Sequence, residues 1–536
     1  MRQLKGQYLL FFAISLFFLF FGLGHNSLWD DEANTALFGK SVWRTGDTNA
    51  LLGNNLIAFR EGLELKDLKN RLIPPIQYYF ISPVAGIFDP TSPNIRIPFA
   101  AIAVLCLLGM FLWVSGAEKR PERINLFLFC MLGNTSWFLF HRQCRYYSLS
   151  TLLSLATIFF YIKIIKEPKN MIWFFLTFLF LLGTHYIAFF GLAVALLMDF
   201  ILFGKNKKDL RKYAEIKNLL AAGIFFIGAG VIVWIFNPLH NPVTLYQPES
   251  IILDKIKLWY WNLRDLNSCQ FGWLGILPIS LWAFRREPFC LPFRISLGVI
   301  TYAMGVSLVS PQPVGWASVA DIRYMQATIP ALVFLTSHLI SILPWRLLPK
   351  IALCFLFCWT NVPHNLISRS LGQAPPPFQI AQISFLHELF FPNPEPYGPT
   401  ARWIRNHVSP GSTIWVLPDY MTYPLMFHAP KAVYAWQLRS DQKNEEQFKS
   451  LPDIHFQGLV PPDFIVAFGP SVQHVRQLIG QWSMQGLCYQ EIARLMTFWK
   501  DLYRPELFWR TFKPIENFDP NNEAIYIFQR QLEPGA

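Results

Sequence analysis

The strongest constraint on the fold of this chain is a succession of eleven apolar segments, each near the length needed to cross a bilayer. The composition agrees: 53% of the 536 residues are hydrophobic, only 15% are charged, and the mean hydropathy is +0.30. Such a chain is expected in a membrane rather than in free solution. The segments are 8–24, 97–114, 124–140, 147–165, 171–184, 186–203, 219–236, 271–284, 295–310, 327–343 and 351–367.

Basic residues collect in the short loops on one side of these segments. A net charge of +12 would also suit a nucleic-acid partner, but this clustering is the positive-inside pattern. Segments 1–7, 115–123, 163–170, 204–218, 285–294 and 344–350 hold 19 Lys and Arg. The short loops opposite, 141–146, 185, 237–270 and 311–326, hold 6. The asymmetry predicts a cytoplasmic N-terminus, an extra-cytoplasmic C-terminal region and no nucleic-acid partner.

Two segments allow other readings of this topology. The segment 8–24 follows Arg2 and Lys5 like a signal peptide, but no small-residue cleavage site follows it, which favours a retained signal-anchor. The apolar stretch Ile76–Phe88 would reverse every later loop if it spanned the membrane. It has 13 residues and contains Pro83, so we interpret it as an interfacial or re-entrant helix.

The predicted fold is an α-helical polytopic membrane protein of about eleven transmembrane helices with a C-terminal extra-cytoplasmic α/β domain. Its expected parts are a transmembrane domain over 1–370, a Pro-rich linker over 371–398 and a soluble domain over 399–536. The first external loop, 25–96, is expected to carry surface helices at Asn34–Trp43 and Lys66–Lys69. In the C-terminal domain we expect helices at 400–408 and 472–485 and strands at 412–417, 432–438, 464–468 and 524–528.

Three adjacent carboxylates, Asp30, Asp31 and Glu32, follow the first apolar segment. Carboxylates at the mouth of a membrane helix are costly unless they are solvated, paired or used. A carboxylate here can deprotonate an acceptor hydroxyl or bind a metal ion. The alternative is structural: Asp30 caps the next helix while Asp31 and Glu32 interact favourably with its dipole.

Basic and aromatic residues gather in the loops predicted to face the same side. Arg142, Arg145 and Tyr146 lie in the second external loop, where guanidinium groups suit a lipid phosphate. Anchoring of the chain at the interface is the alternative for them. A tight turn is predicted at His185-Tyr186, where the alternative for His185 is a structural role. Arg323, beside Tyr324, has a local pair with Asp321 as its alternative.

The order of several short motifs resembles the GT-C superfamily of polyprenyl-phosphate-sugar-dependent glycosyltransferases. Over about residues 1–340 the chain is similar to the branch of the protein O-mannosyltransferases and the lipid A aminoarabinose transferase. The motifs are Asp31-Glu32-Ala33, Pro74-Pro75-Ile76-Gln77-Tyr78-Tyr79, Arg96-Ile97-Pro98, Gln143-Cys144-Arg145-Tyr146-Tyr147, Thr184-His185-Tyr186 and Arg323-Tyr324. The C-terminal part resembles the extra-cytoplasmic domain of bacterial relatives.

The resemblance implies an inverting glycosyltransferase with a polyprenyl-phosphate-linked sugar as donor. Asp31 would be the general base, with Glu32 as a second catalytic carboxylate. The acceptor would be a protein, a lipid or a polysaccharide, and membrane lipids would surround the spans. The expected substrate-binding residues are Asp30, Arg71, Arg142, Arg145, Tyr146, His185, Tyr186, Arg323 and Tyr324.

Cofactor use is left open: either none is required or a divalent cation is held by Asp31 and Glu32. Ile73 stands before Pro74 where relatives often carry Lys or His, and the second external loop lacks an acidic residue that some relatives carry. Two alternatives from other classes are a lipid-linked sugar transporter and a catalytically inactive scaffold. A transporter needs ionisable residues within its spans, and here only Asp199 and His338 lie near span ends.

Overall fold

The computed structural model describes residues 6–203, 215–236, 251–269, 291–310, 322–370, 372, 374–375, 377–392, 394–500 and 524–531. The chain divides into two compact units. The first, here the helical unit, contains Met1–Phe21 and Phe99–Phe390; the second, the mixed unit, contains Gly22–Pro98 and Phe391–Arg504 together with the last strand. The sequence predicts that the transmembrane domain ends at residue 370 and includes the first external loop, 25–96. In the structure this loop belongs to the same unit as the C-terminal region.

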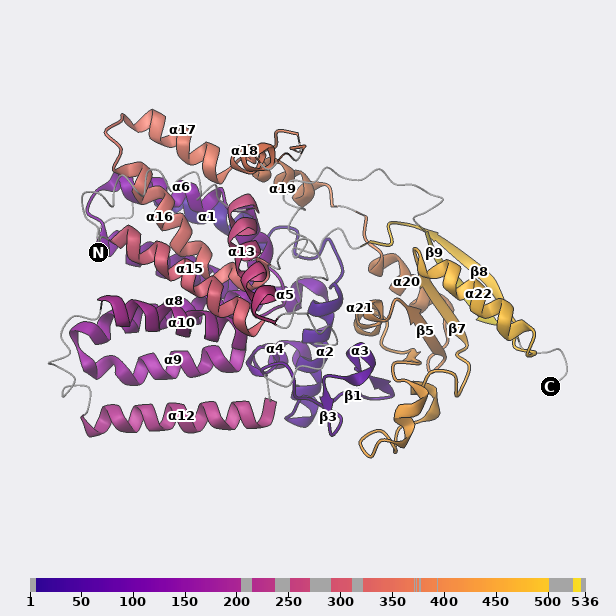
Figure 1. The fold of residues 1–536 in the computed structure, drawn as a ribbon. Coiled ribbons are helices and arrows are strands. Elements are labelled where there is room, and N and C mark those ends of the chain that lie inside the picture. The colour runs from indigo at the N-terminus through magenta and orange to yellow at the C-terminus, as the bar shows by residue number, and fades with distance from the viewer. Residues whose placement is uncertain are drawn as a thin grey trace. The chain divides into compact units, whose positions relative to one another are not determined.

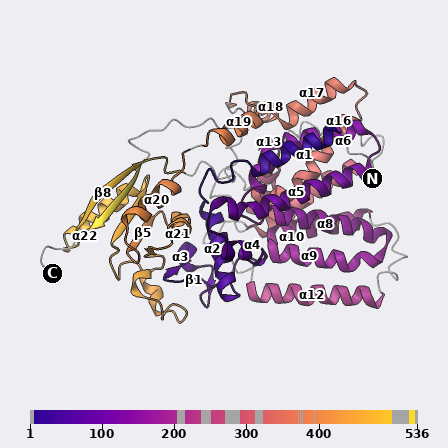
Figure 2. The same ribbon diagram turned by 180° about the vertical axis from the view of Figure 1, so that it is seen from behind.

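The helical unit is built from apolar helices, several of which lie side by side. Within it α8, α9, α10 and α12 run alongside one another (Figures 1 and 2). Its helices are α1 (Gly6–Phe20), the main part of α5 (Ser92–Ala117), α6 (Pro121–Leu132), α7 (Thr135–His141), α8 (Tyr147–Lys166), α9 (Met171–Thr184), α10 (Tyr186–Phe203), α12 (Ile216–Phe236), α13 (Ile251–Cys269), α15 (Leu291–Val309), α16 (Ile329–Ser341), α17 (Leu347–Cys358), α18 (Val362–Ser370) and α19 (Ala381–Phe390), with short 3-10 turns η1 (Pro168–Asn170) and η4 (Ile322–Thr328).

Five of the described helices are long and apolar enough to cross a membrane: α5, α8, α10, α12 and α15. A sixth span results if α6 and α7, which are bent by 64° at their junction, are counted together, and α1, α9 and α17 are shorter apolar helices. Most predicted apolar segments within the described residues coincide with one of these helices or with the pair α6 and α7. Segment 327–343 coincides with α16, segment 351–367 covers parts of α17 and α18, and segment 271–284 lies outside the described residues. The helical membrane fold is thus confirmed, while the helix α13 occupies a stretch predicted to be a loop.

The mixed unit begins with α2 (Asp30–Thr45), which packs against α4 (Ile76–Ile87). Glycines allow the two helices to approach closely: a Cβ on Gly39 would lie 2.5 Å from Ile81 Cγ2. This packing fixes the position of α2 and hence of its acidic first turn. Between the two helices lie the hairpins β1 (Leu51–Leu52) with β2 (Asn55–Leu56) and β3 (Leu65–Lys66) with β4 (Lys69–Asn70), and the short helix α3 (Phe59–Gly62).

The predicted helix at Lys66–Lys69 is wrong, because these residues form the turn of the β3–β4 hairpin. Asp67 and Leu68 have φ angles of 53° and 55°. Positive φ at both central residues defines the type I′ geometry that matches the twist of two antiparallel strands. Asp tolerates this conformation, but Leu rarely adopts it. Only one of the two central residues is therefore typical of such a turn.

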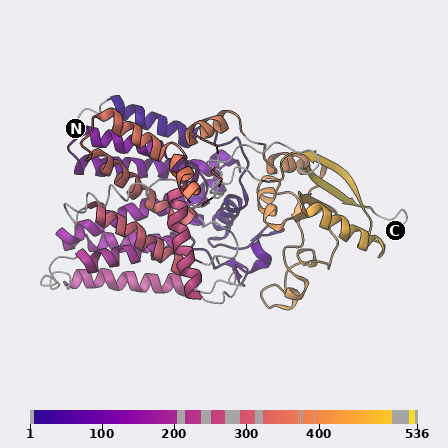
Figure 3. The same cartoon turned by 45° about the horizontal axis from the view of Figure 1, so that its top comes forward.

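The C-terminal part of the mixed unit is a five-stranded sheet of order β6-β5-β7-β9-β8. β6, β5 and β7 are parallel, and β9 and β8 complete the sheet in antiparallel pairing. β7 is buried along its whole length, as a continuous apolar strand in the middle of a covered sheet should be, and α22 packs against this sheet (Figure 3). The elements are α20 (Tyr397–His407), β5 (Thr413–Leu417), η5 (Asp419–Met421), α21 (Thr422–His428), β6 (Val433–Tyr434), η6 (Ser440–Asn444), η7 (Asp453–His455), β7 (Phe464–Phe468), α22 (Ser471–Ser483), β8 (Tyr489–Met496) and β9 (Ala524–Arg530).

Candidate functional site

The acidic trio forms the first turn of α2. The chain enters the helix through Trp29, which is extended and provides no side-chain cap. The carboxylate of Asp30 accepts the backbone N–H of Asp31 at 2.8 Å. Exposed N–H groups and the positive end of the helix dipole both favour carboxylates here. Asp30 and Glu32 are buried, whereas Asp31 is only half-buried and is the most accessible of the three.

Glu32 forms a fully buried ion pair with Arg96 at the start of α5. Nε of Arg96 lies 2.9 Å from Oε1 of Glu32, and its Nη2 lies 2.5 Å from Oε2. Both residues have 0% relative exposure. Because both carboxylate oxygens accept from the guanidinium, Glu32 fits a structural role better than the predicted roles in catalysis or metal binding.

Arg96 also holds the connection that leads into α2. Its remaining N–H groups donate to the carbonyl oxygens of Leu23, Asn26 and Ser27 at 2.8–2.9 Å. In the sequence Arg96 stood out only as part of the motif Arg96-Ile97-Pro98, although a charged residue that opens an apolar segment indicates a buried partner. Arg96 therefore positions the acidic turn, and the carboxylate of Glu32 accepts the other hydrogen bonds of the Arg96 guanidinium.

Two further contacts join this connection to the C-terminal part of the mixed unit. The backbone N–H of Leu28 donates to Nε2 of His428 at 3.1 Å, and the hydroxyl of Ser27 donates to Glu395 at 2.9 Å. Burial of His428, with Arg96 and Arg405 nearby, lowers the pKa of that imidazole to about 3. A neutral imidazole is what the contact requires, since Nε2 must accept a hydrogen bond there.

A second group of predicted residues comes together in the helical unit. The rings of Tyr146 and His185 stack with their centroids 3.8 Å apart, and Tyr324 stacks on His185 at 5.5 Å. The guanidinium of Arg145 lies 5.2 Å from the ring of Tyr146, and that of Arg323 lies 5.2 Å from the ring of Tyr324. We call these five residues the cation–aromatic cluster. It sets two fixed positive charges beside three stacked rings.

His185 holds its place because it sits in the break between α9 and α10, as the sequence predicts. Its backbone is extended, and its Nδ1 accepts the N–H of Ala188 at 3.2 Å, so in the neutral imidazole the proton is on Nε2. Tyr186 opens α10 and its ring lies 6.2 Å from that of His185. Asp321, the alternative partner of Arg323, lies outside the described residues.

Arg142 lies apart from the cation–aromatic cluster in its contacts. It is fully buried and donates to the carbonyl oxygens of Phe18 at 3.2 Å and Phe21 at 2.6 Å, at the C-terminal end of α1. A cation at this position satisfies helix-end carbonyls and complements the helix dipole. These contacts favour the anchoring interpretation for Arg142.

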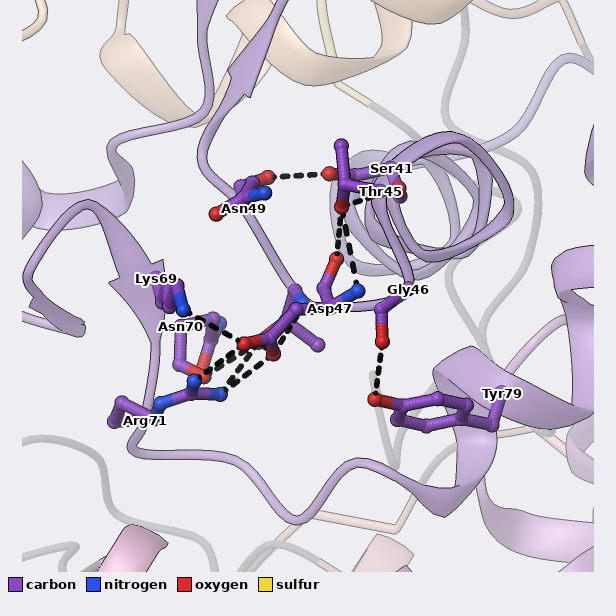
Figure 4. A network of polar contacts seen from close by, with 10 residues as sticks. Ser41, Thr45, Gly46, Asp47, Asn49, Lys69, Asn70, Arg71 and Tyr79 are labelled. Carbon is purple, nitrogen blue, oxygen red and sulfur yellow. Dashed lines mark hydrogen bonds and ion pairs between the residues drawn. The ribbon is translucent and has the colours of Figure 1, made fainter.

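Arg71 lies in a polar network at the C-terminal end of α2 (Figure 4). Its guanidinium donates to both carboxylate oxygens of Asp47, at 2.9 and 2.7 Å, and Lys69 pairs with the same carboxylate. These cations hold the pKa of Asp47 well below its usual range. Because Asp31 stands at the opposite end of this 16-residue helix, the network does not bring Arg71 to the acidic turn.

The two ionisable residues near predicted span ends also have local explanations. Asp199 accepts from Arg294 at 2.8 and 2.7 Å, and His338 stacks on Phe334. Within the described ranges no three His, Cys, Asp or Glu side chains form a group that would hold a metal ion.

The described elements are arranged as in solved structures of another membrane protein. A structure of ArnT, the lipid A aminoarabinose transferase, from Cupriavidus metallidurans bound to undecaprenyl phosphate matches with a TM-score of 0.56 and 12% identity, covering 88% of this chain and 95% of that one. The apo state of the same protein matches with a TM-score of 0.54 and 12% identity, covering 88% of this chain and 94% of that one. The chain therefore shares the fold of ArnT along most of its length, as its motifs predict.

An oligosaccharyltransferase from Archaeoglobus fulgidus, in its apo form, is also similar, with a TM-score of 0.45, 10% identity and coverage of 89% of this chain and 70% of that one. No protein-family model matches the sequence, and no curated protein sequence does so.

Proposed function

We propose that this protein is an inverting glycosyltransferase that moves a sugar from a polyprenyl-phosphate donor to an acceptor hydroxyl. The observation that carries the proposal is the shared fold with ArnT over 88% of the chain. The structure of that protein contains bound undecaprenyl phosphate. The proposed site of action is the outer face of the cytoplasmic membrane, which the distribution of Lys and Arg supports.

Asp31 is proposed as the general base. It is the most accessible carboxylate of the acidic turn, and Arg96 and His428 hold the connection before it in place. As the acceptor oxygen attacks the anomeric carbon, its proton passes to the carboxylate of Asp31. The bond from the anomeric carbon to the phosphate oxygen breaks on the opposite face, which inverts the configuration.

Arg145 and Arg323 are proposed to bind the phosphate of the donor. The leaving phosphate gains negative charge as the glycosidic bond breaks, and fixed guanidinium groups stabilise that charge without reorganising. The stacked rings of Tyr146, His185 and Tyr324 hold both arginines. His185 and Tyr186, which shape the break before α10, are proposed to contact the donor as well.

Reconstitution tests the proposal. Purified protein in proteoliposomes would be supplied with a series of polyprenyl-phosphate sugars and with extracted envelope acceptors, and mass spectrometry would detect the glycosylated acceptor and the released polyprenyl phosphate. We expect both products in equal amounts. Movement of intact donor across the bilayer without cleavage of its glycosidic bond would instead support a transporter.

A further inference from the structure

A cavity of about 480 Å³ lies in the mixed unit beside the C-terminal half of α2. It is distinct from the acidic first turn, which lies at the other end of that helix. The lining residues come from α2, the β1–β2 hairpin and the loops around β5 and β6. They are Lys40, Arg44, Leu52, Gly53, Asn54, Asn55, Pro410, Gly411, Met426, Pro430, Lys431, Ala432 and Val433.

The cavity carries three positive charges and no carboxylate. Lys40, Arg44 and Lys431 are in its lining, which includes no Asp or Glu. Among the described residues none of the three forms an ion pair. Burial of Lys40 and the charge of Arg44 both lower the pKa of the Lys40 amine. Three uncompensated cations around one cavity attract an anion.

The walls of the cavity are held in place by hydrogen bonds. Lys40 and Arg44 are four residues apart, so they lie on the same face of α2. The amide of Asn55 donates to the carbonyl oxygen of Ala432 at 3.0 Å, which ties the hairpin to the chain before β6. The N–H of Gly411 donates to the carbonyl oxygen of Lys431 at 2.9 Å. These hydrogen bonds therefore fix the backbone segments that surround the cavity and its positive groups.

The remaining lining indicates what the anion belongs to. Leu52, Pro410, Met426, Pro430 and Val433 provide apolar surface, and Asn54 brings an amide group. A sugar ring presents apolar C–H faces together with hydroxyl groups, so it matches such a mixed lining. The volume falls in the range of small-molecule sites. An acidic sugar, with a phosphate or carboxylate, combines these features with the charge.

We propose that this cavity binds an acidic sugar unit of the acceptor, an inference that rests on the proposed transferase function. Lys40 and Arg44 follow Asp31 by nine and thirteen residues, which corresponds to about 14 and 20 Å along a helix. The acidic unit would thus be held about that far from the attacked hydroxyl. The acceptor class is an anionic glycan or glycolipid long enough to reach both ends of α2.

A titration without donor tests the site independently of transfer. The full chain in phosphatidylcholine nanodiscs would be titrated calorimetrically with glucose 6-phosphate and with glucose, at about 0.01 M ionic strength, where screening is weak. The test variant is Arg44→Gln with Lys431→Gln, both exposed positions. The matched control, Lys66→Gln with Arg402→Gln, removes two exposed charges outside the cavity lining.

We expect glucose 6-phosphate to bind at least about tenfold more tightly than glucose, and the test variant to lose about tenfold or more of that affinity. The control variant and Asp31→Asn should bind like the wild type, and glucose 6-phosphate should compete with the acceptor for transfer. Absence of binding, equal binding by the test variant, or binding with no effect on transfer would overturn the proposal. Loss of binding in phosphatidylglycerol discs would also overturn it, by assigning the cavity to lipid headgroups. If these binding results hold but no transfer occurs, the transferase function fails while the anion site stands.

Discussion

Arg96 and Glu32, 64 residues apart in the chain, form a bidentate ion pair with no exposure to solvent. The same guanidinium donates to three carbonyl oxygens before α2. One buried cation thus fixes both the entry to the acidic turn and one of its carboxylates. The pair leaves Asp31 as the carboxylate with access to solvent.

Removal of Glu32 is expected to destabilise the protein. Breaking a buried ion pair by deleting one partner typically costs about 3–5 kcal/mol, because the other charge stays buried. Glu32→Ala should therefore lower the midpoint of thermal unfolding, measured in detergent, far more than Glu446→Ala, which removes a largely exposed partner of Lys449. If Glu32→Ala has wild-type stability but no activity, the structural role is wrong and Glu32 has a catalytic role.

Arg145 and Arg142 are expected to differ in what they contribute. Arg145→Ala removes a proposed phosphate contact and should weaken donor binding by about 1.5–3 kcal/mol, the value of a charge-assisted hydrogen bond. Arg142→Ala removes contacts to the end of α1 and should lower thermal stability more than affinity. Equilibrium binding of the polyprenyl-phosphate sugar, with unfolding midpoints for both variants, separates the two effects. Unchanged donor affinity in Arg145→Ala would leave this arginine as an anchor.

The pH dependence of the free energy of unfolding should include a contribution from the titration of His428. Its pKa is lowered from the ordinary 6.5 to about 3 in the folded chain, so below pH 6.5 the unfolded chain takes up a proton that the folded chain does not. Stability is therefore complete above about pH 6.5 and falls as the pH drops toward 3. His428→Gln keeps an acceptor for the N–H of Leu28 but does not titrate. Unfolding midpoints between pH 4 and 7 should fall less steeply in this variant; equal slopes would show that His428 does not contribute.

Topology provides a separate prediction. The excess of Lys and Arg on one side of the apolar segments predicts that the C-terminal region is extra-cytoplasmic. Reporter fusions near Glu395 should be active in the form that requires export. Activity only in the form that requires the cytoplasm would reverse the orientation and, with it, the proposed face of action.

Local patterns predicted the helices well because apolar length and composition determine them directly. The break at His185 followed from a polar pair inside a long apolar run. Other features depend on pairing that the sequence does not display. The β3–β4 turn places Leu68 at positive φ, and β8 mixes exposed and half-buried residues with no regular apolar face.

The residue types in the candidate site could be predicted from the sequence, but the residues that they contact could not. Arg145, Tyr146, His185, Arg323 and Tyr324 come from three separate loops, yet they meet as one cluster. For the acidic turn, the three carboxylates could be predicted from local pattern, but Arg96, the partner of Glu32, could not. Long-range contacts of this kind are set by packing, which no local periodicity encodes.

The transfer rate of Asp31→Asn tests the central claim most directly. Asn keeps the shape of the side chain and suits a helix start, but it cannot accept a proton at neutral pH. With folding and donor binding near wild type, the rate of sugar transfer by the purified variant should fall by about 10²–10⁴-fold, the usual contribution of a general base. Asp30→Asn, the matched control in the same turn, should lose much less. A wild-type rate for Asp31→Asn would contradict the assignment and make the acidic trio a helix start only.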